Sequence, residues 1–586
     1  MQADAADTSH IERPLEGTAT NALFGSDVVA DTLRALDVPW IALTPGASYR
    51  GLHDSLVNYL GNERPQMLVC LHEENAVALA HGWAKVTGRP MAAAVHSNVG
   101  LFHATMAIFN AWCDRAPVLV IGATGPVDAV RRRPWIDWIH TAQDQGAIVR
   151  PYVKWDAQPA SPGAAREALI RAAWLASTAP CGPVYVNLDA GMQEAAVTDP
   201  LPPIEPARFM PPAILGAPPQ AVADAASLLR GARHPVILMG RVSRSDAAWQ
   251  QRRALAESLG ARVATDGKIG AAFPTDHHLH IGAPATFPSD ALKEALRSAD
   301  VILSLDWVDL GGTLGAACGA APAGKVIQVS LDHHLHNGWS MDHQALPPVD
   351  LLLAADPDSV VAALLRELGI AATPAPAEAA PPSAMEATSG TISVSRLART
   401  LRAVTADHAV SLLHVPLGWN AADWPLRHPL DYIGTEGGAG IGGGPGIAVG
   451  AALALRGTGR LPVAVLGDGD FLMGITALWT AVHYQIPLLV VVANNRSFFN
   501  DEMHQERVAR MRGRAIENRW IGQRLADPEI DLAQLGRAQG TAGFGPTSDA
   551  AALQAALREA VTVVAGGGVA VVDVRVEPGY SPPARG

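Results

Sequence analysis

Side chains that suit a divalent cation follow two apolar runs between residues 461 and 501. Asp468 lies in a Gly-Asp-Gly-Asp segment directly after the run 463–466, and Asn495 follows the run 488–493. Carboxylate and amide oxygens are ligands for Mg²⁺ or Ca²⁺ rather than for zinc, and a backbone carbonyl near Ser497 would complete the protein's share. The glycines let the backbone approach a ligand, and the following helix start offers free N–H groups to an anion. A cation beside an anion site predicts a diphosphate held through Mg²⁺.

The elements that must position these side chains form one βαβ unit. Residues 475–485 have the apolar spacing of a helix and separate the two runs. Strands joined in this way are parallel with a right-handed crossover. Asp468 and Asn495 would then both lie past strand carboxyl ends, where open α/β sheets bind ligands. Gly-Asp-Gly is also an ordinary turn, but its pairing with Asn495 across the unit favours the ligand site.

This stretch resembles the diphosphate-binding motif of thiamine diphosphate enzymes. The closer similarity is to the decarboxylases and carboligases that include benzoylformate decarboxylase and the acetolactate synthase large subunit, and ALWTAVHYQIP at 477–487 resembles the benzoylformate decarboxylase version. The resemblance implies bound thiamine diphosphate and Mg²⁺. It places Asp468, Asn495 and Ser497 at the metal, and gives cofactor contacts to Gly467, Asp468, Gly469, Asp470, Asn495 and Phe498.

Glu73 is the second chemical landmark. It stands between a predicted strand at 67–71 and a predicted helix at 73–86, where the helix dipole favours a carboxylate. A first-turn glutamate is also common in ordinary helices. The segment 71–90 resembles the family segment whose glutamate hydrogen-bonds the aminopyrimidine ring and favours its imino tautomer, and position assigns that role to Glu73. His72, beside it, is expected to point to the opposite face and to be structural.

A glycine-rich segment at 434–454 runs into a predicted apolar helix at 447–455. So many glycines indicate close approach of the backbone to a ligand or between elements, rather than a flexible loop. By the resemblance, Gly440 and Ile441 contact the cofactor, and Ile441 supports its bent form.

Residues on the substrate side are predicted from the resemblance alone. In the segment 95–112, His96 matches the active-site histidine of benzoylformate decarboxylase, and His103 lies in the stretch GLFHA, which also resembles 2-hydroxyacyl-CoA lyases. The family serine after Pro-Gly is replaced by Ala47, with Ser48 next, and a second family histidine in the middle domain has no match.

The segment after Asn495 is more polar than in the family. Asp501 and His504 occupy positions that are apolar there, which suggests a substrate with a polar or charged distal group. The basic segment 506–519 fits either a solvated helix face or a lid over an anionic substrate.

The alternation of apolar runs and helical patterns predicts an α/β fold of three doubly wound parallel-sheet domains. Strands are expected at 40–43, 67–71, 91–95, 118–121, 184–188, 236–239, 262–265, 301–305, 326–329, 463–466, 488–493 and 569–576. Composition predicts a flexible arm at 1–20, linkers at 196–218 and 371–390, a tail at 579–586, and three domains at 21–195, 219–370 and 391–578. The resemblance implies that the first is the pyrimidine-binding domain, the second the central domain and the third the diphosphate-binding domain.

Bulk properties limit the partners of the 586-residue chain. A net charge of −12 argues against nucleic-acid binding. Four scattered cysteines without a Cys-x-x-Cys motif, a polar N-terminus and no long apolar run predict a cytoplasmic protein outside the membrane. The central domain lacks a Gly-x-Gly-x-x-Gly motif, so FAD, which acetolactate synthases hold there, is possible but not indicated. The resemblance implies a homodimer or homotetramer with active sites at the dimer interface.

The expected function is a thiamine diphosphate- and Mg²⁺-dependent lyase that decarboxylates a small 2-oxo acid, as in benzoylformate decarboxylase, with possible carboligation to an aldehyde. Three alternatives stay open. One is an acetolactate synthase-like carboligase, another is a C–C lyase acting on a 2-hydroxyacyl or diketone substrate, and the third is a non-catalytic relative. The presence of Glu73, Asp468 and Asn495 argues against the last.

Overall fold

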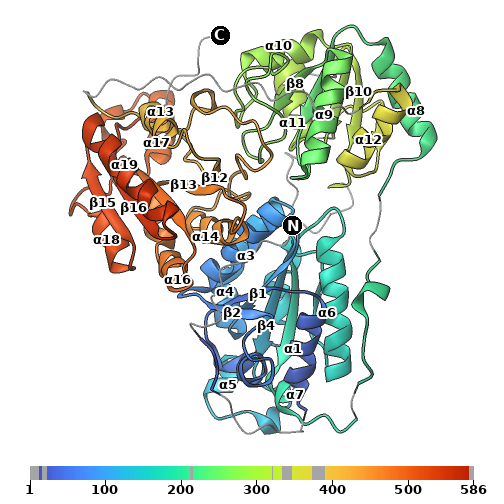
Figure 1. Ribbon diagram of the computed structural model, residues 1–586, viewed down its shortest axis with the longest axis vertical. Helices are drawn as coiled ribbons and strands as arrows, with labels where there is room; N and C mark the ends of the chain where they lie inside the picture. The colour runs from blue at the N-terminus through green and yellow to red at the C-terminus, as the bar shows by residue number, and fades with distance from the viewer. Residues whose placement is uncertain are drawn as a thin grey trace.

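The computed structural model describes residues 12–15, 23–199, 201–211, 215–319, 321–332, 346–371 and 390–579. Three sheets lie in three separate regions of the chain (Figure 1), and all pairings between their strands are parallel. This arrangement confirms the predicted α/β fold with three parallel-sheet domains.

The first domain has the strand order β2-β1-β3-β4-β6-β5. Its central strands are buried along their whole length, as expected for apolar runs covered on both faces. Because the chain leads from β1 to β2 on one side and from β3 to β4 on the other, the connections after β1 and β3 run in opposite directions, and a crevice is expected at the carboxyl ends of these two strands. The strands are β1 (Trp40–Leu43), β2 (Gln66–Val69), β3 (Met91–Val95), β4 (Val118–Thr124), β5 (Asp156–Ala157) and β6 (Val184–Asp189). The helices are α1 (Gly25–Ala35), α2 (Arg50–Asp54), α3 (Glu73–Thr87), α4 (Ser97–Cys113), α5 (Ile136–Ile139), α6 (Pro162–Ser177) and α7 (Ala190–Glu194).

The central domain has the order β11-β10-β9-β7-β8. Its strands are β7 (Pro235–Met239), β8 (Arg262–Thr265), β9 (Val301–Leu305), β10 (Lys325–Val329) and β11 (Leu351–Leu353). Its helices are α8 (Pro219–Gly231), α9 (Asp246–Leu259), α10 (Asp290–Ser298), α11 (Leu310–Cys318) and α12 (Pro357–Leu368).

The third domain has the order β12-β13-β14-β16-β15 and contains the predicted βαβ unit. Strands β13 and β14 pair in parallel, and two short helices rather than one connect them. The strands are β12 (Val410–His414), β13 (Leu461–Gly467), β14 (Leu488–Asn494), β15 (Ala542–Thr547) and β16 (Val569–Arg575). The helices are α13 (Val394–Val404), α14 (Gly444–Ala454), α15 (Asp468–Gly474), α16 (Ala477–His483), α17 (Phe499–Met511), α18 (Leu532–Ala538) and α19 (Ala550–Ala565).

Helices α3 and α14 lie side by side and join the first and third domains (Figure 1). Residues from both domains share one hydrophobic core, which includes Val77 and Ile447. The helices approach so closely that a Cβ atom at Gly82 would collide with the backbone carbonyl of Ile447. Glycine at this position therefore permits the contact that brings the start of α3 to the start of α14.

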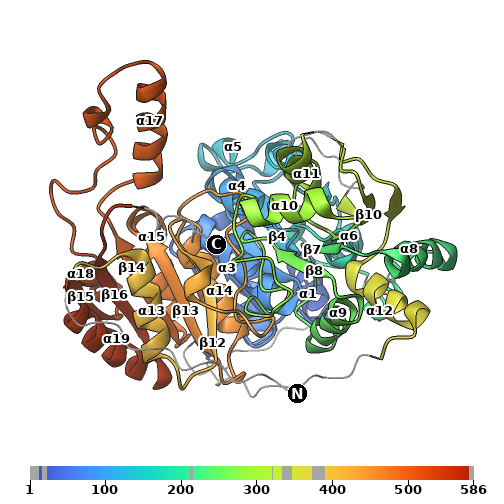
Figure 2. The same cartoon turned by 90° about the horizontal axis from the view of Figure 1, so that it is seen from above.

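Two peripheral segments bear on the predictions. Helix α17 projects away from the body of the third domain (Figure 2). Within the predicted arm 1–20 the structure describes only residues 12–15, where the Glu12 carboxylate accepts a hydrogen bond of 2.8 Å from Tyr484 Oη.

Residues 372–389 of the second predicted linker, residues 200 and 212–214 of the first and residues 580–586 of the tail lie outside the described residues. None of the helices in the described parts of the chain is long and apolar enough to span a membrane.

Candidate active site

Glu73 is the first residue of α3, at the end of β2. Its side chain is buried, with a relative exposure of 8 % for the residue, and Oε2 lies 3.2 Å from His103 Nδ1 on α4. Gly100, one turn before His103, makes room for the carboxylate, because a Cβ atom there would lie 2.8 Å from Glu73 Oε1. The structure therefore brings together Glu73 and His103, which were predicted separately.

His96 follows β3, at the crevice between β1 and β3. Its Nδ1 lies 2.9 Å from Ser48 Oγ, and Ser48 Oγ also accepts a hydrogen bond of 3.2 Å from the Ser97 amide. Ser48 is buried, whereas Ala47 beside it is exposed. Since Nδ1 is engaged, Nε2 is the nitrogen that His96 can offer to a substrate.

Two further histidines complete this group. The His140 ring, after α5, meets the His96 ring edge-on with centroids 4.8 Å apart, and the His72 ring stacks on His103 at 5.0 Å. The prediction that His72 points away from this site is therefore wrong. His72 is the N-cap of α3 and has extended backbone dihedral angles (φ −155°, ψ 141°), so the helical face argument does not apply to it.

The neighbouring rings affect each other's protonation. Burial lowers the pKa of His96, and the charge that His140 would carry lowers it further. Burial and His103 lower the pKa of His72 in the same way. These histidines are therefore held toward the neutral form, in which one ring nitrogen accepts and the other donates.

Asp468 and Asn495 converge at the carboxyl ends of β13 and β14. The Ser497 amide donates to both side chains, at 3.2 Å to Asp468 Oδ2 and 2.9 Å to Asn495 Oδ1. Arg496, which lies between Asn495 and Ser497, has a positive φ of 60°, and this conformation turns the chain back toward β13. Asp468 is buried, and burial raises its pKa, so a bound cation would offset the cost of its charge.

This donor set fits a hard cation. Among the described residues, no three His, Cys, Asp or Glu side chains form a group that could hold a metal ion. A cation here would rely on one carboxylate, one amide oxygen and the predicted carbonyl of Ser497. The Ser497 hydroxyl is not free for this role, because Oγ donates to Glu502 Oε1 at 2.5 Å. The Phe498 ring lies against Gly469, where a side chain would collide with it.

The glycine-rich segment lies between these two groups of residues. Gly440 packs against Met106 of α4, and the Ile441 side chain is 41 % exposed. The Asp470 carboxylate points toward this segment, because its Oδ1 accepts hydrogen bonds from the amides of Gly442 and Gly444. Gly467, the remaining predicted cofactor contact, is the N-cap of α15.

Asp501 and His504 are exposed on the projecting helix α17 (Figure 2). Neither forms a hydrogen bond with Glu73, His96 or His103. The structure thus leaves these two predicted substrate contacts apart from the histidine group.

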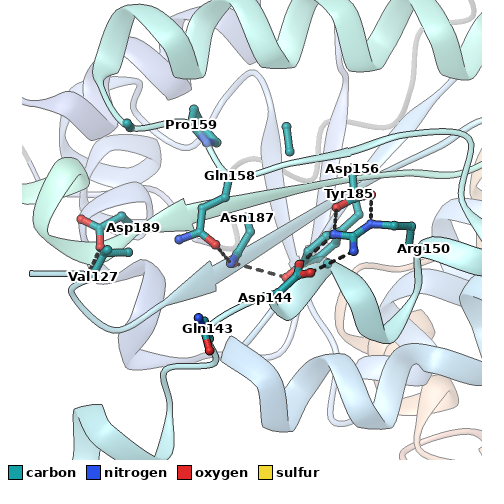
Figure 3. Close-up of a pocket in the computed structure, with 13 residues that line it drawn as sticks. Val127, Gln143, Asp144, Arg150, Asp156, Gln158, Pro159, Tyr185, Asn187 and Asp189 are labelled. Carbon is teal, nitrogen blue, oxygen red and sulfur yellow. Dashed lines mark hydrogen bonds and ion pairs between the residues drawn. The ribbon is translucent and has the colours of Figure 1, made fainter.

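A separate cavity of about 580 Å³ lies past the carboxyl ends of β4, β5 and β6 (Figure 3). Arg150 is paired there with both Asp144 and Asp156, and Asn187 donates to Gln158 at 3.0 Å. No pattern in the sequence predicts this cavity. It adjoins the opposite edge of the sheet from β2, and Glu73, His96 and His103 are not among its lining residues.

Comparison with protein families decides the affiliation. Models of the thiamine pyrophosphate enzymes match three segments: the N-terminal TPP binding domain at residues 24–148, the central domain at 222–364 and the C-terminal TPP binding domain at 417–574. The chain belongs to the thiamine pyrophosphate enzyme family. The order of the three matches is the order of the three sheets along the chain.

Individual relatives support the same affiliation at low identity. Benzoylformate decarboxylase of Pseudomonas aeruginosa is 27 % identical over 448 residues, covering 73 % of this chain and 78 % of its own. Acetolactate synthase of Mycobacterium bovis is 26 % identical over 495 residues, covering 81 % and 77 %. The crystal structure of benzoylformate decarboxylase from Polynucleobacter necessarius has a TM-score of 0.77 at 21 % identity and covers 95 % of this chain and 99 % of its own, which shows a shared fold.

Proposed function

We propose that this family member is a thiamine diphosphate- and Mg²⁺-dependent lyase that removes CO₂ from a 2-oxo acid and releases an aldehyde. The observation that carries the proposal is the position of buried Glu73 at the end of α3 that faces the third domain, whose Asp468 and Asn495 converge on one amide. Similarity to benzoylformate decarboxylase supports this reaction class. Similarity to acetolactate synthase supports carboligation as the second candidate.

The residues that would hold the cofactor lie on both domains. Asp468, Asn495 and the Ser497 carbonyl would bind Mg²⁺ and through it the diphosphate. Glu73 would hold a proton against the aminopyrimidine ring, and His103 would fix the orientation of the Glu73 carboxylate through Oε2. When bound, thiamine diphosphate supplies a carbanion that adds to the substrate carbonyl and an electron sink for the pair released with CO₂.

Proton transfer distinguishes the two candidate outcomes. Conversion of a 2-oxo acid to an aldehyde and CO₂ requires one proton to replace the lost carboxylate on the same carbon. We assign that transfer to His96 Nε2, because Ser48 engages Nδ1. If a second carbonyl compound reaches this carbon before the proton does, a C–C bond forms and the product is a carboligation product.

The test is CO₂ release from aryl, short aliphatic, and acid- or hydroxyl-bearing 2-oxo acids, with and without thiamine diphosphate and Mg²⁺. The expected result is cofactor-dependent release that Glu73→Gln lowers by at least about a hundredfold. Glu167→Gln is the matched control, because Glu167 is exposed on α6 of the same domain. A best substrate with a distal polar group would support the substrate class suggested by Asp501 and His504. No release from any acid by protein that binds the cofactor would refute the decarboxylase assignment.

A further inference from the structure

The glycine loop 436–444 is held at several points by side chains that the proposed function does not use. The Gly438 amide donates to Asn110 Oδ1 of the first domain at 3.1 Å. The amides of Gly442 and Gly444 donate to Asp470 Oδ1 at 2.6 and 3.3 Å. Since the segment lacks a side chain at most positions, these anchors rather than its own packing define its conformation.

His414, at the end of β12, lies behind this loop and is buried. Its Nε2 lies 3.0 Å from Glu436 Oε2, and its Nδ1 lies 3.2 Å from the carbonyl oxygen of Val465. A carbonyl accepts hydrogen bonds but cannot donate them, and an ionised carboxylate has the same limit. Both ring nitrogens must therefore carry hydrogen, which makes His414 an imidazolium.

The charge of this imidazolium is shared by two carboxylates. Asp470 Oδ2 lies 3.8 Å from His414 Nε2 and has no hydrogen-bond partner, while Glu436 forms the direct bond. Burial opposes the charge on His414, but the hydrogen bond and charge of Glu436 and the charge of Asp470 outweigh it and raise the pKa of His414 to about 9. A neutral ring would leave the buried Glu436 carboxylate uncompensated, which is costly. Burial raises the pKa of Asp470, whose Oδ1 is held by the amides of Gly442 and Gly444.

The network continues into the first domain. Lys85 of α3 donates to Asp114 and to the carbonyl of Thr435, the residue before Glu436. Asp114 also lies 2.8 Å from His81 Nε2. Lys85 therefore fixes Thr435 directly before the loop, His414 binds the first loop residue, Glu436, and Asp470 binds the amide of the last, Gly444.

We propose that His414 is a positioning residue whose positive charge, set between Glu436 and Asp470, fixes the glycine loop in the conformation that receives the cofactor. The assignment of the loop to the cofactor rests on the proposed function. The anchoring of the loop by His414 rests only on the contacts above. Two independent measurements therefore test the two parts.

The first measurement is hydrogen–deuterium exchange of the apoprotein in His414→Gln, with His408→Gln as the control because His408 is exposed in the same domain. We expect the amides of the 436–444 loop to exchange about tenfold faster in His414→Gln and to be unchanged in His408→Gln. We also expect the thiamine diphosphate Kd to rise about tenfold while the substrate KM is unchanged. Exchange equal to that of the unsubstituted protein would overturn the anchoring.

The second measurement does not require a variant. In apoprotein labelled with ¹⁵N-histidine, the His414 ring nitrogens should both give signals of protonated nitrogen at about pH 7. A neutral tautomer would overturn the inference even if His414→Gln did not fold. Faster loop exchange without a change in cofactor Kd would retain the anchor and refute the role in cofactor binding. Absence of decarboxylase activity would count only against the proposed function.

Discussion

The Oγ atom of Ser48 lies 2.9 Å from Nδ1 of His96, and this contact joins the segments that follow two neighbouring parallel strands. Ser48 follows β1 and His96 follows β3, so the hydrogen bond spans the crevice in which doubly wound sheets bind ligands. The serine also accepts the Ser97 amide, which leaves its own hydrogen available to one acceptor. Ser48 therefore orients the His96 ring rather than contacting the reacting carbon in this arrangement.

Ser48→Ala should lower kcat for the best 2-oxo acid by about tenfold with little change in KM, because the ring loses the partner that fixes its tautomer. Steady-state kinetics test this, with Ser298→Ala, exposed on α10, as the control. His96→Ala should cost more than Ser48→Ala, and the double variant should cost no more than His96→Ala alone. Additive losses would contradict a role exerted through His96.

His140→Gln should raise the pKa of His96, because the substitution removes the neighbouring imidazole that disfavours a second positive charge. Burial remains the larger cause, so the pKa should stay below the ordinary value of about 6.5. NMR titration of ¹⁵N-labelled histidine in the apoprotein measures the shift. An unchanged His96 titration would show that the ring contact has no electrostatic consequence.

The lowered pKa of His96 also makes the stability of the folded protein depend on pH. The folded-state pKa of His96 is below that of the unfolded chain, so between these two values the unfolded state binds more protons and stability rises with pH. The stabilising contribution is complete above about pH 6.5 and is lost as pH falls below it. His140→Gln should therefore reduce the loss of thermal stability between pH 7 and pH 5, relative to the unsubstituted protein.

Asp468→Asn should abolish the rise in Tm that thiamine diphosphate and Mg²⁺ together produce, because the amide cannot supply the charged ligand. The apoprotein should be as stable or more stable, by about 1 kcal/mol, because burial raises the pKa of Asp468 and the substitution removes a costly charge. Thermal unfolding with and without ligands tests both. Asp407→Asn, at an exposed position, is the control. A full cofactor-induced shift in Asp468→Asn would contradict the metal assignment.

The purified protein should show no flavin absorption. In the central domain, polar contacts lie at the crevice between β7 and β9: the Arg241 amide donates to the Asp306 carbonyl at 3.0 Å, and the Arg241 side chain pairs with Asp332. Arg115 of the first domain binds the same Asp332 carboxylate at 2.5 Å. Ion pairs thus occupy the place where a doubly wound domain would bind a dinucleotide. A visible flavin spectrum would contradict this reading of the crevice.

The sequence predicted elements well where apolar runs alternate with turns. The strands around Asp468 and Asn495 were found because both are buried on two faces and carry few polar residues. The edge strand β5 was not, because its two residues, Asp156 and Ala157, form no apolar pattern. Helix α15 was missed because the Gly-Asp-Gly-Asp segment read as a break, whereas the helix begins directly at Asp468.

Likewise, only some residues of the candidate site could be predicted from the sequence. The resemblance named Glu73 and His96, and both follow predicted strands, so their place at the carboxyl-end edge of the first sheet could be expected. His140 could not be predicted, because it follows a short helix far from any strand end and meets His96 only through the path of the chain after β4. The loop anchors Asn110 and His414 come from different domains, and only tertiary packing brings them to one loop.

Glu73 begins α3 of the first domain and Asp468 begins α15 of the third domain. The family resemblance implies that each active site combines the Glu73 of one chain with the Asp468 of another, in a homodimer or homotetramer. Two inactive variants, Glu73→Gln and Asp468→Ala, would then form mixed dimers in which one of two sites contains both native residues. Dissociation, mixing and reassociation should restore about a quarter of the activity, because random pairing makes half of the dimers mixed.

Two controls make this result interpretable. Each variant treated alone in the same way should stay inactive, and light scattering should give two or four times the chain mass of 61.2 kDa. Restoration of activity in the mixture requires Glu73 from one chain and Asp468 from another. No restoration in mixtures proven to contain mixed dimers would assign both residues to one chain and would refute the sharing of a site between chains.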